Sequence, residues 1–235
     1  SYDDYIKSTR KDLHPEIKDI IDNLPDNIKK LNNIILYGSS GVGKYTQALR
    51  IIHKYSPSKL KYEKKIVLEY YEKKTELNIK ISDIHFEIDM ELLGVNSKTL
   101  WNDLFNQIID IISARNNNIG IILCKNFHCI HSELLEIFYS YMQNINLTNI
   151  TLKFIILTEH IGFLPNNIIN ICKKIDIKRP TKTLYNKCVS GINKANDINS
   201  ISNIRNITDN INELDNPYSK IVNNIMDIII NKDTI

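Results

Sequence analysis

Hydrophobic positions along the chain alternate between short apolar runs and amphipathic stretches. The short runs are typical of strands buried on both faces, and they predict strands at 32–38, 84–89, 119–127 and 152–160, with a hairpin of two more strands within 65–81. The stretches between them have apolar positions at helical spacing, which predicts helices at 14–24, 44–55, 98–115 and 132–145. This alternation predicts an α/β fold, a doubly wound parallel sheet flanked by helices.

The pattern changes after Pro180, where the chain becomes polar and reads as helical throughout. We therefore predict an α/β domain at 1–180 and a small helical, lid-like region at 181–235. A chain of 235 residues is long enough for one large α/β domain with a small appendage.

A glycine-rich segment, "YGSSGVGKYT" at 37–46, joins the first predicted strand to a predicted helix. It fits the G-x-x-x-x-G-K pattern in the strand and helix context that this pattern requires. Glycine lets successive N–H groups turn toward phosphate oxygens, and the helix N-terminus and the lysine add positive charge. The segment predicts a nucleotide phosphate site formed by Gly38, Ser39, Ser40, Gly41, Val42, Gly43, Lys44, Tyr45 and Thr46.

Tyr45 departs from the pattern at the position that normally supplies a small hydroxyl to Mg²⁺. A phenol oxygen cannot imitate that hydroxyl, because it lies several bonds farther out on a rigid ring. Thr46 is not a simple substitute, since one helical step turns a side chain by about 100° around the axis. We therefore expect Mg²⁺ binding to be weak or absent.

Composition and charge narrow the picture only slightly. The net charge of +3 does not indicate nucleic acid, although the Lys-rich segment 59–65 forms either a local basic patch or a solvated turn. No apolar run approaches membrane-spanning length, so no membrane partner is expected. The cysteines show no CxxC spacing and the histidines no ligand spacing, so we expect an intracellular, reducing location and no metal role for Cys124, Cys129, Cys172, Cys188, His85, His128 and His131.

The segment "HFEIDMELLGVNSKTLWNDLFNQII", 85–109, carries a family resemblance together with the phosphate loop. It resembles the small subunits of replication factor C, the sliding-clamp loader of the AAA+ class. It looks most like the subunit whose loop reads Gly-Lys-Lys-Thr, which here is Gly43, Lys44, Tyr45 and Thr46. The resemblance covers roughly residues 14 to 180 and implies an AAA+ P-loop domain.

The family's second motif is an apolar strand that ends in an acidic pair, which organises Mg²⁺ and polarises the attacking water. Here the resemblance places Lys125 and Asn126 at those positions, or Cys124 and Lys125 in a register one residue earlier. A cation opposes Mg²⁺ and an amide has no basicity to offer a water. We expect no catalytic residue, and only an unexpected arrangement would let one of three acids substitute: Asp83, Asp89 and Asp103.

Three further family elements are altered in this chain. The sensor position corresponds to Glu159, beside Thr158, and its carboxylate would repel a phosphate unless it serves as a displaced metal ligand. The element that carries an arginine finger corresponds to 170–172, Asn-Ile-Cys, where the arginine is missing and Lys173 lacks the planar fork. Arg205 is the candidate second sensor, or else an exposed helix arginine.

The resemblance implies a subunit that binds ATP or ADP with little hydrolysis within a hetero-oligomeric clamp loader. Its partners would be the other loader subunits, the sliding clamp and, through the complex, primer-template DNA. We expect a location in the nucleus or at the cytoplasmic replication site of a large DNA virus, and a family collar that is incomplete in this chain. Two alternatives remain open: an active P-loop ATPase with relocated metal ligands, and a scaffold that uses the AAA+ fold without nucleotide.

Overall fold

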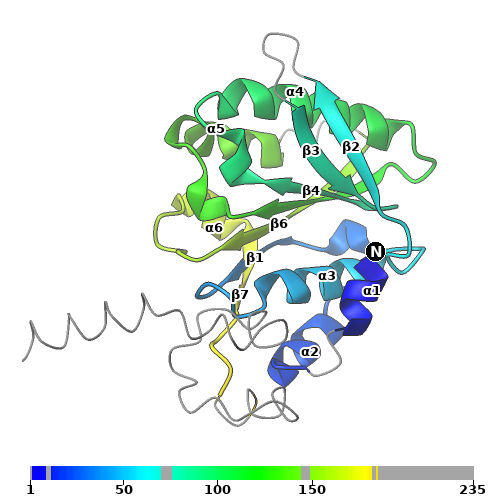
Figure 1. Ribbon diagram of the computed structural model, residues 1–235, viewed down its shortest axis with the longest axis vertical. Coiled ribbons are helices and arrows are strands. Elements are labelled where there is room, and N and C mark those ends of the chain that lie inside the picture. The colour runs from blue at the N-terminus through cyan, green and yellow to red at the C-terminus, as the bar shows by residue number, and fades with distance from the viewer. Residues whose placement is uncertain (1, 9–11, 70–75, 144–148, 182–183, 185–235) are drawn as a thin grey trace, which may run out of the picture. The chain divides into compact units, whose positions relative to one another are not determined.

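The central sheet contains seven strands in the order β2-β3-β4-β5-β6-β1-β7. It belongs to a computed structural model that describes residues 2–8, 12–69, 76–143, 149–181 and 184. The strands β4, β5, β6, β1 and β7 run parallel, and the hairpin β2–β3 pairs antiparallel with β4 (Figure 1). Their bounds are β1 Asn33–Tyr37, β2 Lys64–Glu69, β3 Glu76–Ile81, β4 His85–Asp89, β5 Ile119–Lys125, β6 Thr151–Thr158 and β7 Cys172–Asp176. The predicted α/β class is confirmed.

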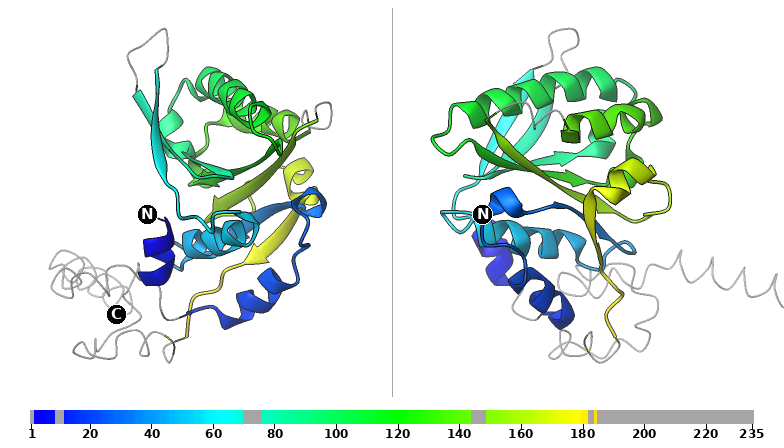
Figure 2. Two further views of the ribbon diagram at one scale, coloured as in Figure 1. Left: turned by 90° about the vertical axis from the view of Figure 1, so that its right-hand side faces the viewer. Right: turned by 180° about the vertical axis from the view of Figure 1, so that it is seen from behind.

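Helices cover both faces of this sheet. Helices α4 and α5 lie on one face, and α3 with α1 and α2 lies on the other (Figure 2). The bounds are α1 Tyr2–Ser8, α2 Pro15–Asp22, α3 Lys44–Tyr55, α4 Ser97–Ser113, α5 Ser132–Gln143 and α6 Asn166–Asn170, with short 3-10 turns η1 Ile28–Lys30, η2 Met90–Leu93 and η3 Phe127–Cys129. In the described ranges we find no helix that is both long and apolar enough to cross a membrane.

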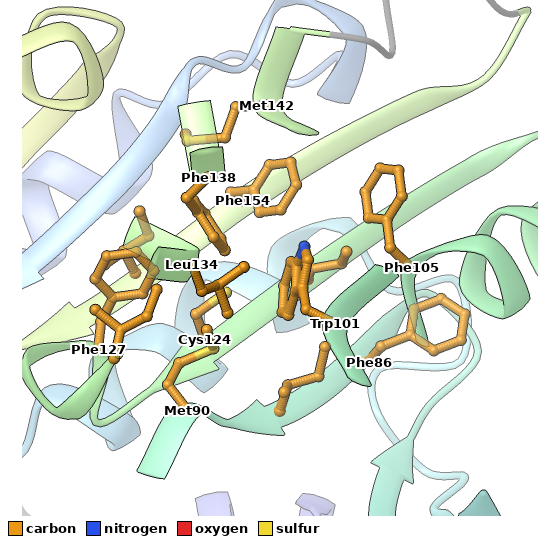
Figure 3. Packing of buried hydrophobic residues seen from close by; sticks show 14 of the residues in the cluster. Phe86, Met90, Trp101, Phe105, Cys124, Phe127, Leu134, Phe138, Met142 and Phe154 are labelled. Atoms are coloured by element: carbon orange, nitrogen blue, oxygen red, sulfur yellow. The ribbon is translucent and has the colours of Figure 1, made fainter. Parts of the chain in front are cut away.

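The larger core lies between the sheet and helices α4 and α5 (Figure 3). Trp101 is fully buried there, and its ring centroid lies 4.9 Å from that of Phe138. Phe138 also packs against Phe127 at 4.8 Å and against Phe154 at 5.7 Å. Trp101, Phe127 and Phe138 are thus core residues, and Tyr141 packs edge-on against Trp101 as a partly buried member of the same cluster.

The elements differ from the prediction mainly at strand ends and at the sheet edge. Helix α3 has the predicted bounds, whereas β5 ends two residues early because Asn126 takes left-handed backbone angles, φ 48° and ψ 42°. Strand β7 and helices α1 and α6 were not predicted. Strand β7 is an edge strand in which only Cys172 and Ile175 are buried, so it lacks the continuous apolar run of the inner strands.

The chain divides into two compact units, Ser1–Ser39 with Gly43–Arg179, and Ser40–Val42 with Pro180–Ile235. The sheet and all the elements given above belong to the first unit. Apart from residues 181 and 184, the helical region predicted at 181–235 lies outside the described residues, as does Arg205.

Candidate phosphate-binding site

The parallel strands all end on the same side of the sheet, which we call its carboxyl edge. The predicted site residues lie at or just after the last residues of these strands. Gly38 comes after β1, Asp89 ends β4, Lys125 ends β5 and Glu159 comes after β6. Ligands of open α/β sheets bind outside the carboxyl ends of the strands. The topology therefore gathers residues that are far apart in the sequence at the edge where a ligand is expected.

Gly43 makes the turn from the glycine-rich loop into α3. Its φ of 101° lies in the left-handed region, where a side chain would be strained, and no side chain caps the helix start. The twelve residues of α3 give its first turn a partial positive charge, which favours an anion. Gly38 and Gly41 also have positive φ, 152° and 71°, although Gly41 belongs with Ser40–Val42 to the second unit.

Lys44 is the first residue of α3 and lies over the start of its own loop. Its Nζ donates hydrogen bonds to the carbonyl oxygens of Gly38 at 2.8 Å and Ser39 at 2.7 Å. The carboxylate of Glu159 lies 3.9 Å from the same nitrogen. Burial lowers the pKa of Lys44, and the charge of Glu159 partly opposes that shift. The structure thus places the predicted sensor residue beside the loop lysine.

The contacts of Tyr45 do not suit a metal ligand. Its phenol donates a hydrogen bond to Glu87 Oε2 at 2.8 Å, and its ring packs edge-on against Tyr5 at 5.5 Å. Burial, together with the negative charge of Glu87, raises the pKa of Tyr45, so the phenol keeps its proton. Thr46 is also engaged, since its hydroxyl lies 3.1 Å from the phenol oxygen of Tyr5.

Lys125, at the end of β5, forms an ion pair with the neighbouring strand. Its Nζ lies 3.0 Å from Glu87 Oε1, 3.9 Å from Asp89 Oδ2 and 5.6 Å from the centroid of the Tyr45 ring. Glu87 is only 5% exposed, so its charge depends on these donors. We name Tyr45, Glu87 and Lys125 the Lys125 cluster.

Asn126 is hydrogen-bonded to Asp89, the second acid of β4 at this edge. Its amide donates to both carboxylate oxygens of Asp89, at 3.0 and 3.1 Å. Asn126 and Lys125 are therefore held in place by acids of β4, a contact that the sequence reasoning did not foresee. The available signal was Glu87 itself, a carboxylate in the middle of an apolar strand that had to be buried.

The residues at this edge do not fit a conventional Mg²⁺ site. In the described ranges, no three His, Cys, Asp or Glu side chains are grouped to hold a metal ion. Asp83 accepts hydrogen bonds from Ser56 and Ser58, and Asp103 lies within α4, so Asp89 alone of the three acids considered reaches this edge. Nearby donors already engage Asp89 and Glu87.

The other predicted residues lie elsewhere. Residues 170–172 lie at the end of α6 and the start of β7, where Cys172 pairs with Asn33 at the first residue of β1. This is the edge opposite the phosphate loop. Cys172 is buried, which raises its pKa to about 12, and Lys173 is exposed. Cys124, Cys129 and Cys172 are free thiols, and Cys188 lies outside the described residues.

Two of the histidines, His85 and His128, are hydrogen-bonded within the fold. His85 is fully buried, and its Nδ1 is hydrogen-bonded to the hydroxyl of Ser82. His128 Nδ1 accepts a hydrogen bond of 3.4 Å from the backbone N–H of Glu159. His128 therefore helps to fix the residue that lies beside Lys44.

Comparison with known proteins gives structural neighbours only. No family model and no curated protein matches the sequence. The structure of PCH-2 from C. elegans matches with a TM-score of 0.44 and 10% identity, over 72% of this chain and 41% of that one. RuvB from Thermotoga maritima, a Holliday junction branch migration motor, matches with a TM-score of 0.45 and 14% identity, over 74% and 50%. The chain thus covers half or less of these proteins.

Proposed function

We propose that this chain is a clamp-loader-like subunit of the AAA+ class that binds ATP or ADP with little or no hydrolysis of its own. The observation that carries the proposal is the contrast at one sheet edge between a phosphate loop with its lysine and a second motif without its acids. Lys125 and Asn126 stand where P-loop NTPases place the residues that hold Mg²⁺ and orient water.

Binding would use the first turn of α3 and Lys44. Among the described residues, no side chain caps the backbone N–H groups of this turn, and the ammonium contacts loop carbonyls and, at 3.9 Å, Glu159. An anion can exchange with these partners, since a charge-assisted bond to phosphate is stronger than a bond to a neutral carbonyl. Gly38, Ser39 and Gly43 would shape the cradle, together with the backbone of Tyr45 and Thr46.

Hydrolysis would fail for a chemical reason. An attacking water needs a group that accepts or orients its proton, and the amide of Asn126 has no basicity and is bonded to Asp89. Lys125 carries a positive charge where an acid would hold the metal. The described residues at this edge therefore support binding and not turnover.

The fuller proposal places the chain in a hetero-oligomeric assembly that loads a sliding clamp on primer-template DNA, in the nucleus or at a viral replication site. Its support is the likeness of 85–109 and of the loop to replication factor C small subunits. The position of 170–172 at the edge opposite the phosphate loop suits a segment that would face a neighbouring subunit. Copurification from the native source with mass spectrometry tests this, because recovery of capsid or transcription proteins in place of loader subunits would overturn it.

Nucleotide binding is tested with ADP and ATP on the purified full chain. Ligand at about 100 times its dissociation constant should raise the free energy of unfolding by roughly 2.7 kcal/mol. Lys44→Ala should reduce the shift at the same ligand concentration to about 0.6 kcal/mol, and Lys61→Ala, at an exposed lysine of the same chain, should keep it in full. ATP turnover that depends on Lys44 would instead favour the ATPase with relocated metal ligands.

A second candidate function is a scaffold without nucleotide. It is favoured by the hydrogen bonds of Lys44, which satisfy the ammonium with the chain's own loop carbonyls. This candidate predicts no shift in melting temperature with ADP or ATP at any concentration, and an unchanged partner set when Lys44 is replaced by Ala.

A further inference from the structure

The Lys125 cluster has a consequence for the ionic form of the ligand. We infer that this site takes its nucleotide free of divalent metal, with the ammonium of Lys125 supplying the positive charge that Mg²⁺ supplies in other P-loop proteins. The inference rests on the proposed nucleotide binding and adds the chemical form of the nucleotide to it.

Formal charges at the end of β5 support this reading. In P-loop NTPases a Mg²⁺ ion is held beside acidic groups, so that an acidic pair together with the ion sums to zero. Lys125 and Asn126 without any ion sum to one positive charge, and to one negative charge when Glu87 and Asp89 of β4 are counted with them. With an acidic pair in place of Lys125 and Asn126, the same four positions would sum to four negative charges. The exchange therefore raises the local charge by three, in the same direction as a bound Mg²⁺ and by one unit more.

The contacts of the two β4 acids oppose entry of a metal. Glu87 is bonded to Lys125 at 3.0 Å and to Tyr45 at 2.8 Å, and Tyr2 donates to it at 3.4 Å. Asp89 is bonded to Asn126 through both oxygens. A divalent ion at either carboxylate would break these bonds and would approach the ammonium of Lys125, a like charge in a partly buried setting.

Lys125 also has the freedom that the role requires. Its side chain is 31% exposed, whereas Glu87 is 5% exposed, so the pair has one buried and one accessible member. A lysine has three rotatable donors on a flexible stem, so it can bond Glu87 and an anion at the same time. The ring of Tyr45, directly after Lys44, lies under this ammonium at 5.6 Å and links it to the phosphate loop.

The test compares ADP affinity of the full-length chain by calorimetry in EDTA and in excess Mg²⁺. We expect equal or weaker affinity in Mg²⁺, because Mg²⁺ complexes the free nucleotide that the site prefers. A gain in affinity of about tenfold or more with Mg²⁺ would overturn the inference and leave the proposed function standing. Absence of binding in both buffers would overturn the proposed function itself.

A pair of substitutions tests the role of Lys125 directly. Lys125→Met with Glu87→Gln removes both charges of the pair together, and ADP affinity in EDTA should fall about tenfold. Lys61→Met, a matched exposed lysine, should leave it unchanged. Unchanged affinity in the double variant would show that Lys125 supplies no charge to the ligand. If the double variant does not fold, the comparison of EDTA with Mg²⁺ on the unaltered chain still decides the question.

Discussion

Two lysines at one sheet edge, each near a glutamate, behave differently. Lys44 lies 3.9 Å from Glu159, whose side chain is 27% exposed, and its closest partners are neutral carbonyl oxygens. Lys125 lies 3.0 Å from Glu87, whose side chain is only 5% exposed. The first lysine can exchange its neutral partners for an anion, whereas the second stays bonded to a buried carboxylate and offers an anion only its remaining donors.

The two acids of β4 account for this difference. Glu87 is bonded to Lys125, and Asp89 is bonded to Asn126. A buried carboxylate needs donors. Lys125 and Asn126 meet that need, so both carboxylates of β4 are already engaged by side chains at the end of β5.

The largest expected effect follows from breaking the Lys125 pair on one side only. Lys125→Met leaves Glu87 buried without its cation, and we expect the free energy of unfolding to fall by about 3 kcal/mol, the low end for a buried pair because Lys125 is partly exposed. Urea denaturation measures it, with Lys61→Met as the control. A loss no larger than about 0.5 kcal/mol would place the pair among ordinary surface ion pairs.

The next effect concerns the other lysine and is seen in binding. Lys44→Ala should weaken ADP binding roughly 50-fold, because a charge-assisted phosphate contact is lost. Its free energy of unfolding should change little, since burial already disfavours the charged form of Lys44 and lowers its pKa. Calorimetry with ADP and urea denaturation on the same variant separate the two. The contrast between the two lysines would be contradicted if Lys44→Ala lowered the free energy of unfolding and left the affinity for ADP unchanged.

The sequence predicted the first of these regions better than the second. The phosphate loop is a local pattern, so Gly43 and Lys44 could be assigned from neighbouring residues alone. The Lys125 cluster joins residues from α3, β4 and β5. Its Glu87 comes near Lys125 because β4 pairs in parallel with β5, in a register that sets Asp89 opposite Lys125. Strand order is not written in a local pattern, so the partner of Lys125 could not be named in advance.

The same limit explains two features of the fold. Strand β7 was not predicted because three of its five residues, Lys173, Lys174 and Asp176, are exposed and polar, so it has no continuous apolar run. On α4 the helical spacing of apolar residues predicts a face that includes Leu104, Ile108 and Ile112, and these three residues are buried. Trp101 and Phe105 are buried as well, although they lie outside that spacing. In both cases burial depends on which neighbouring element is present, and periodicity alone does not determine it.

The pH dependence of stability gives a further measurement on β4, because His85 of this strand is fully buried. Burial lowers the pKa of His85 to about 3, with Asp83 raising it and Arg115 lowering it further, while the ring of Tyr2 packs against it. The unfolded chain binds more protons below its ordinary pKa, so stability is lost as pH falls. From pH 7 to pH 5 we expect a loss of about 2 kcal/mol from this residue.

The control for that loss is His85→Asn, whose amide can replace Nδ1 in the bond to Ser82. In this variant the part of the pH dependence due to His85 should vanish in urea denaturation at pH 7 and pH 5. If the variant keeps the full pH dependence, the loss does not come from His85 and the prediction is wrong.

The smallest effect comes from Tyr45→Phe, which removes the phenol donor to Glu87 and leaves Lys125 in place. No charge is orphaned, so the free energy of unfolding should fall by about 1 kcal/mol, the value of one ordinary hydrogen bond. Tyr62→Phe, at a tyrosine that is 70% exposed, is the matched control. A loss as large as that of Lys125→Met would mean that Tyr45, and not Lys125, keeps Glu87 charged.

Tyr45→Thr tests whether Tyr45 alone prevents Mg²⁺ from binding at this site. It restores a small hydroxyl directly after the loop lysine, the group that ordinarily ligates Mg²⁺. If Tyr45 alone kept the metal out, ADP affinity in this variant would become dependent on Mg²⁺. We expect it to stay independent, because Lys125 and Asn126 still bond the two acids of β4. Only replacement of Lys125 as well should allow Mg²⁺ to change the affinity.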